Sequence, residues 1–248
     1  MKQDGSGGTA ALGRRGFLAG GLAVLAAGPA LASTIDTRGR LLAKCGKIEI
    51  REMPDGQIGI FHWEKLKPNP EPIIAPLSNP RWVLTASFKD RLMELHEKQG
   101  DKYVARGIWP VVTPAPWRLG GQTVHGRAYK VEMQPSWYPS ASLRRKYNLY
   151  RVQNPEENAP PLPPGAVPYG HPGNPMGERK IRFRWFKGHY MPSAVLHGTG
   201  GYPVQMCTEE TSGCVRLYND WIVKLVTELG GPNTIEDGVE MILTPRSL

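Results

Sequence analysis

Strand-like alternation of hydrophobic and polar positions dominates the chain from residue 81 onward. A two-residue period places one set of side chains on each face of a strand, so it is the main sequence signal for β-structure. It recurs in the segments RWVLTASF (81–88), RLMELHEKQGDKYVARGIWPVV (91–112, two runs about a turn at Gln99-Gly100-Asp101), HGRAYKVEMQ (125–134), RKIRFRWFK (179–187) and GVEMILTP (238–245). We therefore expect a core built mainly from a β-sheet.

One helix is expected near the C-terminus. Asn219 is a suitable N-cap, Asp220 lies in the first turn, and Gly230-Gly231-Pro232 ends the segment. The apolar residues of this segment form one stripe at helical spacing: Trp221, Ile222, Leu225, Val226 and Leu229. We interpret the stripe as core packing.

Two proline-rich stretches interrupt the regular pattern. KLKPNPEPIIAPLSNP (65–80) carries five prolines and favours an extended linker or edge segment. It follows a hairpin candidate, KIEIREMPDGQIGIFHW (47–63), with a turn at Pro54-Asp55-Gly56. The region from Asn154 to Pro175 is too long for a simple connection, and such loops are typical of lids, binding loops or disordered segments.

The N-terminal 32 residues have the pattern of an export signal. Arg14 and Arg15 precede an apolar run, Phe17 to Leu31, and Ala30-Leu31-Ala32 is a small-residue cleavage site. A membrane anchor is the alternative, but the run is about fifteen residues long and a spanning helix needs about twenty. The string GRRGFLA resembles a twin-arginine signal, although Gly13 stands where Ser or Thr is usual. We expect export to the periplasm or cell envelope without a stable membrane anchor.

We therefore divide the chain into three parts: an export signal (1–32), an N-terminal extension with the hairpin and the proline-rich linker (33–79), and one catalytic domain (80–245).

The formal net charge is +9. Loss of the signal, with three basic residues and one acidic residue, would leave about +7, which favours an anionic partner. Nucleic acid is one candidate, because residues 179–187 interleave basic and aromatic side chains. An acidic wall polymer or lipid surface fits an exported protein better.

Three cysteines cannot all form disulfides within one chain, so at least one needs another explanation. Cys214 is the candidate to remain outside a disulfide, and a bridge between Cys45 and Cys207 stays open. Gly213, directly before Cys214, allows a tight backbone approach that could aim main-chain N–H groups at one point, as in an oxyanion hole. His197 lies at a strand end and could meet Cys214 across a loop as its base. From the spacing alone, a catalytic pair of Cys214 and His197 and simple packing of both residues in the interior are equally good interpretations.

The segment around these residues resembles a known signature. His197-Gly198-Thr199, a loop, and then Thr211-Ser212-Gly213-Cys214-Val215-Arg216-Leu217 with Asn219-Asp220 is similar to the motif of the YkuD-type L,D-transpeptidases, in particular the ErfK/YbiS/YcfS/YnhG group. The resemblance covers roughly residues 80 to 245 in consistent order. Its other parts are RWVLTASFKDRLMEL (81–95), VVTPAPWRLGGQTVHGRAYKVE (111–132), PSWYPSASLRRKY (135–147) and GNPMG (173–177).

This resemblance implies a mostly β fold, a curved β-sandwich with one or two packed helices, and a cysteine acyltransferase that needs no cofactor or metal. Cys214 would attack the bond between an L centre and the terminal D-Ala of a peptidoglycan tetrapeptide stem. His197 would act as the base, oriented by the Gly198 carbonyl. Backbone N–H groups of Gly213 and Cys214 would stabilise the oxyanion, and Arg216 would bind anionic groups of the stem.

Acceptors implied by the resemblance are a second stem peptide in a 3-3 cross-link, a lipoprotein or a D-amino acid. One departure concerns Ser212, which stands where many members have a second histidine, so His197 would act alone. Two alternatives remain open: an L,D-carboxypeptidase or amidase that resolves the same acyl-enzyme with water, and a non-catalytic wall-binding protein. His125 and His189 are interpreted as structural or exposed rather than as site residues. Neither the CxxC spacing of a redox pair nor the paired spacing of a zinc site is present.

Overall fold

The computed structural model describes residues 40–45, 48–55, 58–61, 66–189, 191, 194–199, 210–232, 235 and 238–248. By its internal contacts the chain divides into Met1–Thr34 and Ile35–Leu248, and every described residue belongs to the second unit. The expected export signal and the Gly56 turn residue lie outside the described residues. In the part of the chain that is described, no helix has the length and apolar character needed to cross a bilayer.

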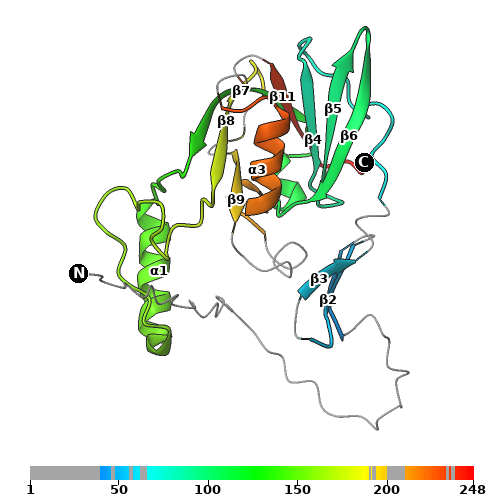
Figure 1. Ribbon diagram of the computed structural model, residues 1–248. Helices are drawn as coiled ribbons and strands as arrows, with labels where there is room; N and C mark the ends of the chain where they lie inside the picture. Colours follow the sequence, from blue (N-terminus) through cyan, green and yellow to red (C-terminus); the bar gives the residue numbers. More distant parts are fainter. Residues whose placement is uncertain are drawn as a thin grey trace, which may run out of the picture. The chain divides into compact units, whose positions relative to one another are not determined.

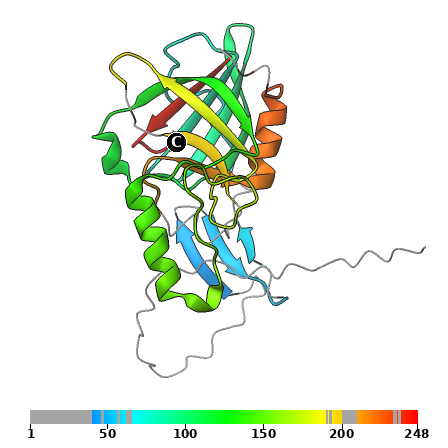
Figure 2. The ribbon, with the colours of Figure 1, turned by 90° about the vertical axis from the view of Figure 1, so that its left-hand side faces the viewer.

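Eight strands form one sheet in the order β10-β9-β8-β7-β11-β4-β5-β6. The sheet curls strongly, as Figures 1 and 2 show, and the mostly β prediction is confirmed. The β10–β9 and β11–β4 pairs are parallel, and the other neighbours are antiparallel. The strands are β4 (Trp82–Ser87), β5 (Leu92–Gln99), β6 (Lys102–Pro110), β7 (Val124–Met133), β8 (Arg179–Trp185), β9 (Val195–Thr199), β10 (Val215–Tyr218) and β11 (Val239–Thr244).

A separate three-stranded antiparallel sheet is formed by β1 (Arg40–Cys45), β2 (Ile48–Glu52) and β3 (Ile58–Phe61). The expected hairpin corresponds to β2 and β3, which pair antiparallel. β1 was not expected. Ile50 of β2 is fully buried in a small cluster with Leu92 and Val112.

The hydrophobic core lies on one face of the eight-stranded sheet, and helix α3 (Asn219–Glu228) packs against β8, β9 and β10 there (Figure 1). Ile222, Leu225 and Val226 of the predicted stripe are buried in this core. The prediction of an Asn219 N-cap is wrong, since Tyr218 holds that position without a side-chain bond. The Asn219 side-chain oxygen instead accepts a hydrogen bond from the backbone N–H of Glu178 (3.0 Å), a residue distant in sequence. This tertiary contact occupies the oxygen that would otherwise cap the helix.

Helix α1 (Ala141–Gln153) was not expected from the sequence. Ser140 caps it by accepting a bond from Leu143 N–H (3.3 Å), but none of its residues is buried. The basic and phenolic side chains of α1 reach the second proline-rich region: Arg144 donates to Pro163 and Gly165, Tyr147 to Pro160, and Arg151 to Ala159. The two segments therefore run side by side (Figure 2), and the helix lacks the apolar stripe by which helices are recognised.

The first proline-rich stretch has no regular secondary structure and bends at several positions over residues 66–80, and it is fixed to the sheet. The Glu94 carboxylate on β5 accepts bonds from the backbone and side chain of Asn69 (2.8 and 3.0 Å). Glu240 on β11 accepts bonds from Leu77 N–H (2.8 Å), Ser78 N–H (2.9 Å) and Ser78 Oγ (2.6 Å). As a result β4 and β11 are buried on both faces.

Glu240→Gln is expected to destabilise the protein by ~2–4 kcal/mol at pH 7, because a carboxamide cannot accept every bond that this buried carboxylate accepts. Burial disfavours the charged form, but the bonds from His125 and Ser78 outweigh it and lower the pKa of Glu240. A lowered folded-state pKa stabilises the fold above the ordinary carboxyl pKa, and this stabilisation is lost as pH falls through the folded value.

The measurement is urea unfolding of both proteins at pH 7 and at pH 3.5. The difference between them should shrink at the lower pH. Exposed Glu156 provides the matched control, since Glu156→Gln should leave stability within ~0.5 kcal/mol. Equal stabilities of Glu240→Gln and wild type at pH 7 would contradict this account.

Candidate active site

Four polar residues lie in one cross-strand row over β7, β8, β9 and β10. Glu132 pairs with Lys180, Lys180 with His197, and His197 with Arg216. Residues paired across a sheet share a face, and side chains two apart along a strand share it too. Cys214 stands two residues before Arg216 and directly precedes β10, so continued alternation would place it on the same face as this cross-strand row. The charges of Arg216 and Lys180 act on its thiol. The core residues of these strands face the opposite side.

His197 is completely buried, and its Nδ1 is hydrogen-bonded to the Gly198 carbonyl oxygen (2.6 Å). A carbonyl can only accept, so Nδ1 carries the proton and Nε2 presents its lone pair. Nε2 is buried, and no hydrogen bond of normal geometry to it is found among the described residues. The Met176 backbone nevertheless acts on the ring and, like that of Gly198, raises the pKa of His197. The bond to Gly198 is the one expected from the sequence.

The His197 imidazole is held in its neutral form. Burial is the main cause, the Arg216 guanidinium adds to it, and Lys180 adds less, while the Gly198 backbone opposes them. Together they lower the pKa of His197 to about 3. A neutral imidazole at physiological pH is the form that can accept a proton.

The Cys214 thiol is partly buried and forms no disulfide. Burial raises its pKa, and three effects act in the opposite direction: the charge of Arg216, a hydrogen bond from the Val195 backbone, and the charge of Lys180. A thiol of raised pKa is protonated at pH 7 and needs a base before it can attack. Cys207 and the side chain of Cys45 lie outside the described residues, so the structure does not test their bridge.

The turn before Cys214 is organised by Thr211. The Thr211 hydroxyl donates to the Cys214 carbonyl and accepts from Gly213 N–H at 3.3 Å, and Thr211 N–H donates to the Thr113 carbonyl (3.2 Å). The Gly213 amide, expected as an oxyanion donor, is therefore directed at the Thr211 hydroxyl through a long bond. Ser212 is exposed.

Three separate pieces of the sequence meet behind His197. The Asn219 carboxamide lies between Gly177 and Gly198, and a Cβ added at Gly198 would come within 2.3 Å of its Oδ1. The same oxygen accepts the bond from Glu178 N–H. Gly177 also has a positive φ of 64°, which favours glycine. The GNPMG turn, the His-Gly pair and the Asn-Asp pair thus form one packed unit.

Gly198→Ala is expected to destabilise the fold by ~2–4 kcal/mol, because the new methyl group overlaps a hydrogen-bonded amide that cannot move without breaking its bond. Thermal unfolding would measure it. Gly100 has a φ of +63° and an added Cβ there meets nothing within 4 Å, so Gly100→Ala measures the cost of backbone strain without overlap, ~1 kcal/mol. A Gly198→Ala protein no less stable than Gly100→Ala would contradict the packing described here.

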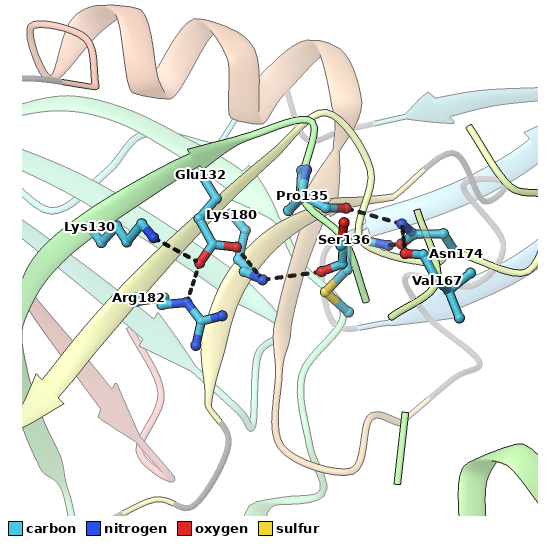
Figure 3. A network of polar contacts seen from close by, with 9 residues as sticks. Lys130, Glu132, Pro135, Ser136, Val167, Asn174, Lys180 and Arg182 are labelled. Carbon is cyan, nitrogen blue, oxygen red and sulfur yellow. Dashed lines mark hydrogen bonds and ion pairs between the residues drawn. The ribbon is translucent and has the colours of Figure 1, made fainter. Parts of the chain in front are cut away.

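A second polar network lies beside Lys180 and is drawn in Figure 3. Lys180 Nζ contacts Glu132 Oε2 (2.5 Å) and the Ser136 carbonyl (3.5 Å), and Arg182 also binds Glu132. Asn174 donates to the carbonyls of Pro135, Val167 and Pro168 and ties the second proline-rich region to the chain after β7. Sequence reasoning missed Lys180 and Glu132. A lysine in an alternating strand is ordinarily expected to face solvent, but Lys180 is buried.

His125 and His189 do not join the site. His125 Nδ1 binds the Glu240 carboxylate (2.8 Å), and the two imidazole rings stack edge to face at 5.2 Å. His125 pairs with Ile242, far along β7 from Glu132. Within the described ranges, no cluster of three or more His, Cys, Asp or Glu side chains could hold a metal ion.

No family model matches the chain, and no curated protein matches it. Among solved structures, that of Bdellovibrio bacteriovorus Bd1075 is similar to this chain, with 15% sequence identity and a TM-score of 0.41. The similarity covers 67% of this chain and 49% of the Bd1075 chain, so the matched part spans about half the length of that protein. A likeness at this level carries no argument about activity.

Proposed function

We propose that the protein is an L,D-transpeptidase that uses Cys214 as nucleophile and His197 as base on peptidoglycan stem peptides, after export to the periplasm. One observation carries the proposal: Cys214 directly precedes β10, which pairs in parallel with the His197 strand, and the imidazole is held neutral with Nε2 as its acceptor. The motif resemblance from His197 to Asp220 supplies the substrate class.

The chemistry requires each group in turn. His197 Nε2 takes the thiol proton as Cys214 Sγ adds to the carbonyl carbon between the L centre and the terminal D-Ala. The tetrahedral intermediate collapses, the C–N bond breaks, and D-Ala leaves as an amine with the proton from His197. A thioester remains on Cys214. An acceptor amine then attacks this thioester, gives its proton to His197, and releases the thiol with a new amide bond.

Two further groups support these steps. The Cys214 backbone N–H is the proposed oxyanion donor, together with Gly213 N–H if its long bond to Thr211 is exchanged for one to the substrate. Arg216 follows the nucleophile by two residues on the same face, where a guanidinium can bind a stem carboxylate through two parallel hydrogen bonds. No metal or nucleotide is needed for thiol acyl transfer.

The test is incubation of the purified protein with a disaccharide-tetrapeptide, with and without a D-amino acid, followed by mass spectrometry of the products. Release of D-Ala with an exchanged or cross-linked product is the expected result. A disaccharide-tripeptide, which has no terminal D-Ala, is the matched control substrate. Tripeptide product alone, whether or not amine is present, would identify an L,D-carboxypeptidase, and no turnover would favour a wall-binding protein.

A further inference from the structure

Lys180 is the member of the cross-strand row that the proposed chemistry does not use. Its side chain is only 5% exposed, although its neighbours Arg182 and Arg184 along β8 reach solvent. A buried ammonium group is strongly disfavoured unless it is paired, and here Glu132 pairs with it at 2.5 Å. The chain therefore maintains a buried charge beside His197, which a surface lysine would not do.

The positive member of the ion pair lies nearer to His197 in the sheet than the negative member. Lys180 is one strand away from His197, and Glu132 is two strands away, on the far side of Lys180. Adjacent strands are separated by about 4.8 Å, so the positive end of the ion pair faces the site and the negative end is held back. Because interactions between charges fall with distance, the net field at His197 and Cys214 is positive.

We propose that Lys180 is a positioning residue of this site, which works through its ion pair with Glu132 to favour both the neutral imidazole of His197 and the thiolate of Cys214. A positive neighbour stabilises the thiolate and disfavours the imidazolium, so Lys180 eases ionisation of the Cys214 thiol and keeps His197 neutral in the resting site, while it makes the imidazole a weaker base. Lys180 lowers the pKa of both groups, after the larger effects of burial and Arg216.

The other charged side chains around His197 and Cys214 do not replace the positive charge of Lys180. On β10 the facing charge is Arg216, and on β7 it is Glu132, which Arg182 and Lys130 also contact. The chain after β7 contributes only the Ser136 carbonyl to Lys180. Glu210, which precedes the turn to Cys214, is paired with Arg91 at 3.7 Å.

The test measures thiol reactivity directly, so it does not depend on turnover of a stem peptide. The rate of Cys214 alkylation by iodoacetamide is followed from pH 5 to pH 10, with the labelled cysteine assigned by peptide mass spectrometry. The double variant Glu132→Gln/Lys180→Met removes both charges and leaves no buried orphan. It should react ~3- to 10-fold more slowly at pH 7, with the pH profile displaced to higher pH.

Two single variants separate an electrostatic role from a structural one. Lys180→Arg keeps the charge and should keep the wild-type profile, whereas Glu132→Gln leaves the lysine without its counter-ion and should displace the profile to lower pH. Displacements of opposite sign by the double variant and by Glu132→Gln are not expected from loosened packing. Identical profiles for wild type and the double variant, or displacements of the same sign for the double variant and Glu132→Gln, would overturn the proposal.

This inference rests on the proposed function only in taking Cys214 as the nucleophile. Displaced alkylation profiles without any stem-peptide turnover would leave Lys180 as a tuning residue and reject the transpeptidase. Turnover by the wild type with undisplaced profiles would reject the role of Lys180 alone. If the double variant does not fold, as judged by circular dichroism, the two single variants still test the proposal: Glu132→Gln should displace the profile to lower pH and Lys180→Arg should leave it unchanged.

Discussion

Cys214→Ala is expected to abolish release of D-Ala and formation of the acyl-enzyme, with a loss of ~10⁴-fold or more in rate. The reason is that the proposed intermediate is a thioester, which only a thiol can form. Arg216 is an unsuitable nucleophile because it stays protonated. Intact-mass spectrometry after rapid quenching would detect the adduct on the wild type and none on the variant.

The fold should tolerate this substitution. Cys214 is partly exposed and lies outside the hydrophobic core, so Cys214→Ala should change the free energy of unfolding by only ~1 kcal/mol. Cys214→Ser keeps the side-chain shape and tests the nucleophile itself: it should be stable and nearly inactive, since a hydroxyl is far harder to ionise than a thiol. An acyl adduct that persists in Cys214→Ala would reject the assignment.

His197→Gln is expected to slow acylation by ~10²- to 10⁴-fold, which is the usual contribution of a positioned general base. Glutamine can still donate to the Gly198 carbonyl, but it has no basic lone pair to take the thiol proton. The substitution should slow iodoacetamide labelling less than acylation, because labelling needs only the thiolate while acylation also needs proton delivery to the leaving amine. Equal losses in both reactions would point to misfolding of the site instead.

The pH dependence of acylation by the wild type tests whether the pKa of His197 is lower than that of an exposed histidine. With a folded-state pKa of about 3, the imidazole stays neutral across pH 5 to 8, so acylation should show no inflection near pH 6.5. The rate should rise with pH as the Cys214 thiol, whose pKa burial raises, loses its proton more readily. An acidic limb centred near pH 6.5 in kcat/KM would contradict a neutral buried imidazole.

Much of the fold could be read from the sequence because alternation and helical periodicity are local properties. The segments that became β4, β5, β6, β7, β8 and β11 alternate clearly, and α3 has its stripe of Ile222, Leu225 and Val226. Helix α1 was missed because its side chains bind proline-rich backbone instead of burying an apolar face. The fixed position of residues 66–80 was missed because its partners, Glu94 and Glu240, lie far away in the sequence.

The candidate site, like the fold, was determined partly by the sequence and partly by the tertiary structure. The order of residues determined which groups are present: a histidine before glycine, a cysteine after glycine, and an arginine two positions later. Tertiary structure alone decided that Lys180 and Glu132 belong beside them, because strand register sets which residues become neighbours. A slip of one residue between β8 and β9 would turn Lys180 away from His197, since alternate side chains point to opposite faces of a sheet.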